Sequence, residues 1–168
     1  MLLGSFRSPD LVTGGRVIER TAVRGVLFRG RELLLLASRH GDYKFPGGGV
    51  EPGESHADAL RREFREECGV VDITLGPGFG STIEEVPAAE SAYDVFRMTS
   101  HYFRCSGGAA GGTRQLEGYE AELQLVPRWV TVNEALTANQ AVQAGGVGMM
   151  RWLVRETAVL EWLASQDT

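Results

Sequence analysis

The chain has 168 residues and a mass of 18.3 kDa, and 43% of its residues are hydrophobic. This length predicts one globular domain with enough core to fold without disulfides or structural metal. With 17 basic and 22 acidic residues, the formal charge is −5, which argues against general binding to nucleic acid or to anionic membranes. The two cysteines form no disulfide framework, and no apolar run has the length of a signal peptide core or a membrane span. We therefore expect a cytoplasmic protein with reduced cysteines.

The N-terminal third of the sequence predicts an arm, a hairpin and a loop. Residues 1–19 are polar and lack periodicity, so we expect a flexible N-terminal arm. Apolar runs at 21–28 and 33–37 flank a short turn that contains glycine, which predicts a β-hairpin. The four leucines of the second run are equally compatible with a helical turn, but the flanking turn residues favour a strand buried on both faces. Glycines and prolines over 39–54 then predict a loop.

A helix is expected over about 56–68. Ser55 and Asp58 fit a capping box, in which the Ser55 hydroxyl accepts from the Asp58 amide while the Asp58 carboxylate reaches back. Gly69 stands where a left-handed C-terminal cap belongs. Apolar residues recur between these two caps at helical spacing: Ala57, Leu60, Phe64 and Cys68.

The remaining sequence predicts four strands and two helices. Residues with high β propensity gather between Gly, Pro and Asn near 71–75, 80–86, 94–105 and 128–132. Glycines within 107–112 predict a flexible loop. Asn133 is the expected N-cap of a helix over about 134–143, and an apolar stripe predicts a C-terminal helix over about 149–165.

Three carboxylates crowd one face of the helix expected at 56–68. At about 100° per residue, Glu63, Glu66 and Glu67 share an arc of about 100°. Like charges at this spacing destabilise a helix, so a cation should offset them. Mg²⁺ prefers carboxylate oxygens, and the preceding glycines let backbone carbonyls approach the same place. The alternative is a solvated helix face whose carboxylates pair with neighbouring arginines.

The spacing of these residues favours the metal interpretation. Residues 48–70 match the pattern G-x5-E-x7-R-E-U-x-E-E-x-G-U, where U is apolar, at every fixed position: Gly48, Glu54, Arg62, Glu63, Phe64, Glu66, Glu67, Gly69 and Val70. The segment resembles a Nudix box, so the chain resembles the Nudix hydrolase family (MutT-like). Phe64 is bulkier than the aliphatic residue usual at its position in that box.

The resemblance implies an α/β (α+β) fold, an α/β/α sandwich with a mixed β-sheet between helices. It implies that residues 20–168 form a single Nudix hydrolase domain that contains the Nudix box at 48–70. The implied reaction is hydrolysis of a nucleoside diphosphate linked to another group, with Mg²⁺ or Mn²⁺ as cofactor. The implied partner is a small nucleotide-derived substrate, with no nucleic acid and no membrane, and the protein would be a monomer or a homodimer.

By the same resemblance, the box residues take the following roles. Glu66 and Glu67 would be the principal metal ligands, and Glu63 would be a further ligand or the base that activates water. The Gly48 carbonyl would complete the metal shell. Arg62 would hold a box carboxylate by a bidentate ion pair, a task that suits a planar guanidinium.

Residues outside the box are weaker candidates. In the family a further carboxylate often completes such sites, and Glu120 is preferred here over Glu117 and Glu122, although each also suits a solvated loop. Arg39 and Lys44 flank the loop that leads into the box and are candidates to contact phosphate, the alternative being a role in surface solubility. Four aromatic residues are candidates to stack on a base, although such residues are more often core: Tyr43, Phe45, Phe96 and Tyr102.

The substrate remains open between three hypotheses. Pro87 lies 17 positions past Val70, close to where members that hydrolyse ADP-ribose place a proline, so ADP-ribose or a related nucleotide sugar comes first. The alternative is a pyrophosphohydrolase that removes unwanted (d)NTPs from the nucleotide pool. A hypothesis from another class is a non-catalytic Nudix domain that binds or senses nucleotides, but such a module has no need of the full acidic cluster.

Overall fold

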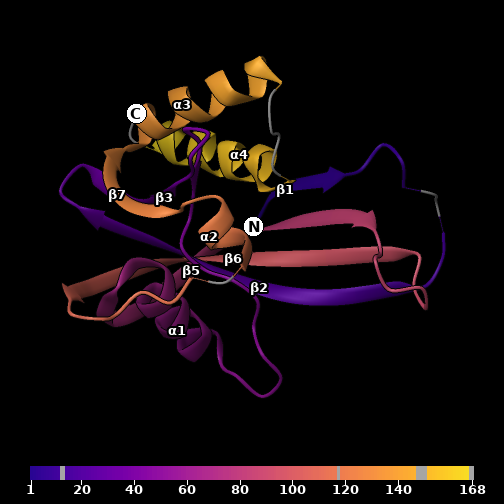
Figure 1. Ribbon diagram of the computed structural model, residues 1–168, viewed down its shortest axis with the longest axis horizontal. Coiled ribbons are helices and arrows are strands. Elements are labelled where there is room, and N and C mark those ends of the chain that lie inside the picture. Colours follow the sequence, from indigo (N-terminus) through magenta and orange to yellow (C-terminus); the bar gives the residue numbers. More distant parts are fainter. Residues whose placement is uncertain (12–13, 117, 147–150, 167–168) are drawn as a thin grey trace.

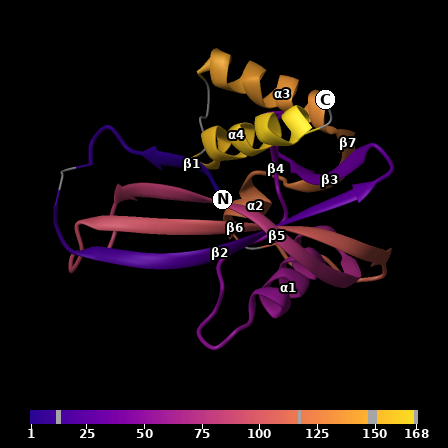
Figure 2. The same cartoon turned by 180° about the vertical axis from the view of Figure 1, so that it is seen from behind.

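A computed structural model describes residues 1–11, 14–116, 118–146 and 151–166 and shows a mixed sheet between helices (Figures 1 and 2). The strands are β1 (Leu2–Arg7), β2 (Val17–Arg29), β3 (Glu32–Ala37), β4 (Tyr43–Lys44), β5 (Val70–Pro87), β6 (Val95–Ala110) and β7 (Val126–Thr131). The helices are α1 (His56–Cys68), α2 (Gly118–Glu122), α3 (Val132–Gly145) and α4 (Arg151–Gln166). The sheet order is β1-β5-β6-β2-β3-β4, and β7 pairs with β3. Helix α1 covers one face, whereas α3 and α4 lie together on the other.

The hairpin predicted near the N-terminus is confirmed. Strands β2 and β3 pair antiparallel, with Phe28 opposite Leu33. The leucines of β3 are buried on both faces, as expected, and alternate between two cores. Leu34 and Leu36 pack on the α1 side with Leu60, whereas Leu33 and Leu35 pack on the α4 side.

The flexible N-terminal arm expected over 1–19 is wrong. Leu2–Arg7 forms β1, which pairs in parallel with β5 so that Leu2 lies opposite Ser81, and β2 already begins at Val17. The strand is only half buried, so its sequence lacks a clear apolar alternation. Its partner lies far away in the sequence, and the hydrogen bonds that define it have no local signal.

Helix α1 begins and ends where the sequence predicts. The Ser55 hydroxyl accepts a hydrogen bond from the Asp58 amide at 3.1 Å and donates to the Asp58 carboxylate at 2.6 Å. Gly69 ends the helix with φ +66°, a left-handed conformation that glycine adopts without strain. The acidic residues of the box therefore lie on a helix with well-defined ends.

Two expectations for the middle of the chain are wrong. The strands expected near 71–75 and 80–86 form one long strand, β5, with irregular register between Leu75 and Gly80. The loop expected within 107–112 is wrong for 107–110, because β6 continues to Ala110, whereas 111–112 lie in neither a helix nor a strand. An ideal Cβ on Gly107 would lie 2.2 Å from the carbonyl oxygen of Asp72, so this glycine allows two strands to approach closely.

The later helices differ from expectation at their starts. Thr131, not Asn133, is the N-cap of α3, and a complete capping box with Glu134 starts the helix at Val132. The helix expected over about 149–165 is α4, although residues 149–150 lie outside the described residues. No helix in the described part of the chain is long and apolar enough to cross a membrane. Cys68 and Cys105 are both free thiols.

Phe64 fits the core because it faces a glycine. The Phe64 ring is fully buried, and an ideal Cβ on Gly25 would lie 2.2 Å from it. We therefore expect Gly25→Ala to lower the free energy of unfolding by about 1–3 kcal/mol, measured by urea denaturation. Adding Phe64→Leu should recover part of this loss, because leucine leaves room for the new methyl group.

The matched control for Gly25→Ala is Gly145→Ala at the end of α3. An added Cβ at Gly145 would have nothing within 4 Å, so this variant should be as stable as the wild type or slightly more stable. If Gly25→Ala unfolds at the wild-type urea concentration, the close packing of Gly25 against Phe64 does not constrain the core.

Candidate active site

Arg62 lies at the centre of the ion pairs that hold the box together. Its guanidinium makes two hydrogen bonds of 3.0 Å to the two carboxylate oxygens of Glu54, and it also donates to the Gly49 carbonyl at 3.0 Å. Its Nη1 atom donates to Glu63 at 2.7 Å and to Glu66 at 3.4 Å. The hydrogen bonds from Arg62 hold the pKa of Glu54 below its usual range. Arg62 thus links the loop before α1 to two carboxylates on the helix.

Glu67 and Lys44 form a buried ion pair. Their side chains are 1% and 3% exposed, and the Lys44 ammonium lies 2.7 Å from the Glu67 carboxylate. The Gly47 amide donates to the other Glu67 oxygen at 2.7 Å. Burial raises the pKa of Glu67 to about 7, although Lys44 opposes this shift. Burial acts to lower the pKa of Lys44, but the opposing effects, led by the Glu67 carboxylate, outweigh it together, so that pKa lies above its ordinary value.

Glu63 lies against the backbone of Gly48. An ideal Cβ on Gly48 would be 2.3 Å from a carboxylate oxygen of Glu63, so only glycine leaves the carboxylate in this place. Burial raises the pKa of Glu63, while the hydrogen bond from Arg62 acts in the opposite direction. The Gly48 carbonyl accepts a hydrogen bond from the Val23 amide at 2.9 Å, which leaves its second lone pair available.

Gly48→Ala should damage the site more than the fold. The added methyl group would displace the Glu63 carboxylate, which is the flexible end of a side chain, so the melting temperature should change little. Misplacement of one box carboxylate should lower metal-dependent activity by about tenfold to a hundredfold. Gly49→Ala is the matched control, because an added Cβ there would have nothing within 4 Å. Equal activity of the two alanine variants would contradict a role for the close approach of Glu63 to Gly48.

The side chains of the site are of the chemical type that binds a divalent cation. Four carboxylates lie in two pairs, each bridged by a basic side chain: Arg62 contacts Glu63 and Glu66, and Lys44 contacts Glu67 and Glu120. In the described residues, no three His, Cys, Asp or Glu side chains form a group that could hold a metal ion as they stand. Carboxylate oxygens are nevertheless the ligands that Mg²⁺ prefers. Glu67 and Glu120 already hold one positive charge, the Lys44 ammonium, between them.

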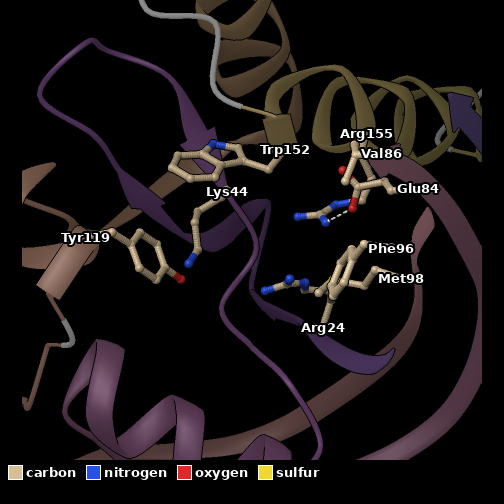
Figure 3. A pocket seen from close by; sticks show the side chains of 9 residues that line it. All are labelled: Arg24, Lys44, Glu84, Val86, Phe96, Met98, Tyr119, Trp152 and Arg155. Atoms are coloured by element: carbon tan, nitrogen blue, oxygen red, sulfur yellow. Dashed lines mark hydrogen bonds and ion pairs between the residues drawn. The ribbon is translucent and has the colours of Figure 1, made fainter. Parts of the chain in front are cut away.

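A cavity of about 250 Å³ opens beside Lys44 (Figure 3). Its walls come from strands and helices that are far apart in the sequence, and they combine charged with apolar and aromatic side chains: Arg24, Lys44, Glu84, Val86, Phe96, Met98, Tyr119, Trp152 and Arg155. Trp152 is held in place by its indole N–H, which donates to Asp42 at 3.0 Å. The cavity therefore offers both aromatic faces and cationic groups to a ligand.

Arg24 is a buried cation that pairs with no acidic side chain among the described residues. Its side chain lies on β2, and the residue is 7% exposed. One Nη atom donates to the Gly47 carbonyl, but Nε has no hydrogen-bond partner and no carboxylate pairs with the guanidinium in the described part of the chain. It acts electrostatically on both Glu63 and Lys44 and therefore lies near the box. A buried, unpaired guanidinium on a cavity wall favours an anionic ligand.

The structure brings one of the two candidate phosphate contacts to the site. Lys44 lines the cavity and contacts the box, as described above. Arg39 instead lies exposed on the surface, where its Nε is 3.4 Å from His40, and it does not line the cavity. Phe96 also lines the cavity, whereas Phe45 and Tyr102 are fully buried in the core.

The three candidate carboxylates from outside the box differ in where they lie. Glu120 is 5% exposed and lies 3.9 Å from the Lys44 ammonium, so it adjoins the site. Glu122 is exposed at the end of α2. Glu117 lies outside the described residues.

Sequence reasoning missed much of the cavity wall. Arg24 could have been noticed, because it is a single charge inside the apolar run of β2. Trp152 and Arg155 carried no such signal, because they lie on a helix more than a hundred residues further along the chain. Glu84 is one of two adjacent glutamates on β5, and nothing local shows which of them faces the cavity.

The fold and the site define an α/β/α sandwich domain with an acidic loop-helix site, and the comparisons agree. A model of the NUDIX domain matches residues 19–153, so the chain belongs to the Nudix hydrolase family, and the expected family and fold class are confirmed. The chain is 23% identical to a MutT protein from Bacillus halodurans, with a TM-score of 0.50 over 71% of this chain and 72% of that one. It is 24% identical to the ORF135 protein of E. coli over 79% of this chain and 96% of that one, with a TM-score of 0.47.

A shorter match adds a curated relative. Over 29 residues the chain is 66% identical to the nucleoside triphosphatase NudI of Escherichia fergusonii. The match covers 17% of this chain and only 21% of the relative's length, so it is a likeness of one segment.

Proposed function

We propose that the protein is a pyrophosphohydrolase that uses a divalent metal ion to cleave an anhydride bond of a nucleoside triphosphate. The position of the cavity carries this proposal. Lys44 lines the cavity and binds Glu67 of the box at 2.7 Å, so the cavity and the acidic site share a wall. A ligand in the cavity would therefore lie next to the carboxylates of the box.

The cavity walls suit the two ends of a nucleotide. Trp152, Tyr119 and Phe96 offer aromatic faces on which a base stacks. Arg24 and Lys44 offer charge-assisted hydrogen bonds to phosphate oxygens on the side toward the box. The base would therefore lie in the cavity, and the phosphate chain would pass Arg24 to reach the acidic residues.

The box residues would hold the metal ion and the attacking water. Glu66 and Glu67 are the proposed principal ligands, with Glu63 beside them and Glu120 adjacent. Bound Mg²⁺ or Mn²⁺ supplies neutralisation of the phosphate oxygens and a lowered pKa for the water. Burial raises the pKa values of Glu63 and Glu67 above their ordinary value, and a carboxylate with a higher pKa accepts a proton from water more readily.

A nucleoside triphosphate fits the cavity better than the nucleotide sugar first expected. Pro87, which suggested ADP-ribose, lies exposed at the end of β5 and does not line the cavity. The cavity volume of about 250 Å³ is near the lower limit of small-molecule sites, about 300 Å³, and suits one base rather than a base with a second sugar. The nucleoside triphosphatase that matches over 29 residues supports the same choice.

An activity screen with the full chain tests the proposal. Nucleoside triphosphates and ADP-ribose are incubated with the protein and Mg²⁺ or Mn²⁺, and EDTA serves as the blank. We expect metal-dependent release of a nucleoside monophosphate and pyrophosphate from a triphosphate. A wild-type rate no higher than that of Glu67→Gln would instead favour a non-catalytic nucleotide-binding module. Faster turnover of ADP-ribose than of any triphosphate would contradict the choice of substrate but leave the reaction class intact.

A further inference from the structure

The cavity presents one carboxylate among its cationic groups. Arg24, Lys44 and Arg155 supply hydrogen-bond donors to it, whereas Glu84 on β5 is the one acidic residue on the walls that the described residues form. The Glu84 side chain is 14% exposed and lies next to Arg155 at the edge of the cavity (Figure 3).

The Glu84 carboxylate is held in a fixed orientation. Arg155 on α4 donates from Nη1 to the Oε2 atom of Glu84. Arg155 is itself 4% exposed and also donates from Nε and Nη2 to Glu156, which is fully buried. Within the described residues, the hydrogen bonds to the Glu84 carboxylate all run to Oε2, so Oε1 is free to accept from a ligand.

Neutralising Arg155 does not require Glu84. The buried Glu156 already balances the guanidinium charge, so Glu84 adds a further negative charge at the cavity wall. Arg155 supplies a donor to Oε2 only, so a ligand in the cavity gains a charge-assisted hydrogen bond where it brings a donor to Oε1. The ligand group that enters the cavity should therefore bring donors toward Glu84.

Among the common bases, guanine best supplies these donors. Its N1–H and 2-amino group lie side by side and can donate to the two oxygens of a carboxylate in parallel. Adenine and cytosine offer one amino group beside an acceptor nitrogen, and uracil and thymine offer one N–H between two carbonyls. We propose that Glu84 selects guanine, and hence that the substrate is a guanine nucleoside triphosphate; this rests on the function proposed above.

Two ligands that differ in one group test the proposal on the wild-type protein. Inosine triphosphate lacks the 2-amino group of GTP and is otherwise identical to it. With Mg²⁺ present, we expect kcat/KM for GTP to exceed that for ITP by about tenfold or more, the usual effect of a hydrogen bond to a charged group. ATP should be a poorer substrate than GTP. Equal kcat/KM values for GTP and ITP overturn the proposal without any variant.

Variants of Glu84 and of its neighbour separate selection from general damage. Glu84→Gln should lower the GTP-to-ITP ratio toward one, mainly through a higher KM for GTP. Glu85→Gln is the matched control, because Glu85 points to the other face of β5 and binds Arg97 at 2.7 Å. Glu85→Gln should keep the wild-type GTP-to-ITP ratio of kcat/KM. A Glu84→Gln variant that also keeps the ratio overturns the proposal.

Binding measurements distinguish failure of this proposal from failure of the proposed function. Calorimetric titrations with GTP and with ITP need no turnover. Tighter binding of GTP without metal-dependent hydrolysis of any triphosphate would support the role of Glu84 and overturn the hydrolase. Metal-dependent hydrolysis with equal binding of GTP and ITP would support the hydrolase and overturn the role of Glu84.

Discussion

Glu67→Gln is expected to lower kcat for the triphosphate by about a hundredfold or more, because the variant lacks a charged metal ligand at the centre of the box. Glutamine has nearly the same shape and can still accept the hydrogen bond that the Gly47 amide makes with Glu67 at 2.7 Å. The variant also leaves the buried Lys44 ammonium, 2.7 Å from Glu67 in the wild type, without this counter-charge, so circular dichroism at the assay temperature should show that it is folded before the loss is assigned to the missing metal ligand. Glu122→Gln, which changes an exposed carboxylate at the end of α2, is the matched control and should keep full activity.

Comparison with Glu67→Gln should also show how Glu67 makes stability depend on pH. Burial raises the pKa of Glu67 to about 7 in the folded protein, above its value in the unfolded chain. The protonated carboxyl is thus favoured by folding, and this contribution is present at low pH and lost as the pH rises through about 7. In EDTA, the melting temperature of the wild type should fall relative to that of Glu67→Gln between about pH 5 and about pH 8.5.

Mg²⁺ should affect the melting temperatures of the two proteins differently at the higher pH. It should raise the melting temperature of the wild type, because binding to the folded state alone stabilises it. It should leave Glu67→Gln nearly unchanged. If Glu67→Gln retains more than half of the wild-type activity and responds equally to Mg²⁺, Glu67 is not a principal metal ligand.

Local signals explain which parts of the fold could be predicted. Helix α1 is framed by Ser55 and Gly69, whose roles depend only on their immediate neighbours. The β2–β3 hairpin likewise depends on a short turn between two apolar runs. Strand β1 has no local signal because it is defined by pairing with residues such as Ser81, and the role of Gly107 depends on Asp72, which lies in another strand. A glycine that permits close strand packing has the same local appearance as a glycine in a loop.

The residues of the site also differ in whether local sequence predicts them. The acidic box could be predicted because its residues lie within one loop and one helix at fixed spacing. Arg24, Glu84 and Arg155 meet only after β2, β5 and α4 have packed together, and no sequence period relates them. The net charge of −5 includes Glu63, Glu66 and Glu67, which belong to a site where a bound cation would reverse the local sign. The acidity therefore does not argue against a small phosphorylated ligand.

Lys44→Met should destabilise the metal-free protein by about 3–5 kcal/mol, the usual result of removing one partner from a buried ion pair. The Lys44 ammonium lies 2.7 Å from Glu67, and the two side chains are 3% and 1% exposed. Without it, the Glu67 carboxylate is left buried with the Gly47 amide as its remaining hydrogen-bond partner in the described residues. Urea denaturation in EDTA at about pH 8 measures the loss where Glu67 would otherwise be charged.

The double variant Lys44→Met/Glu67→Gln shows whether the loss arises from the pair. Because it removes both charges together, it should be clearly more stable than Lys44→Met alone, and the coupling free energy from the four proteins isolates the pair. Arg39→Met, which removes an exposed cation from the same stretch of chain, should change stability by no more than about 0.5 kcal/mol. Mg²⁺ should restore part of the stability of Lys44→Met, because a divalent cation supplies the positive charge that the ammonium no longer provides. A Lys44→Met protein as stable in EDTA as the wild type would show that the Glu67 carboxylate does not need this charge when no metal is bound.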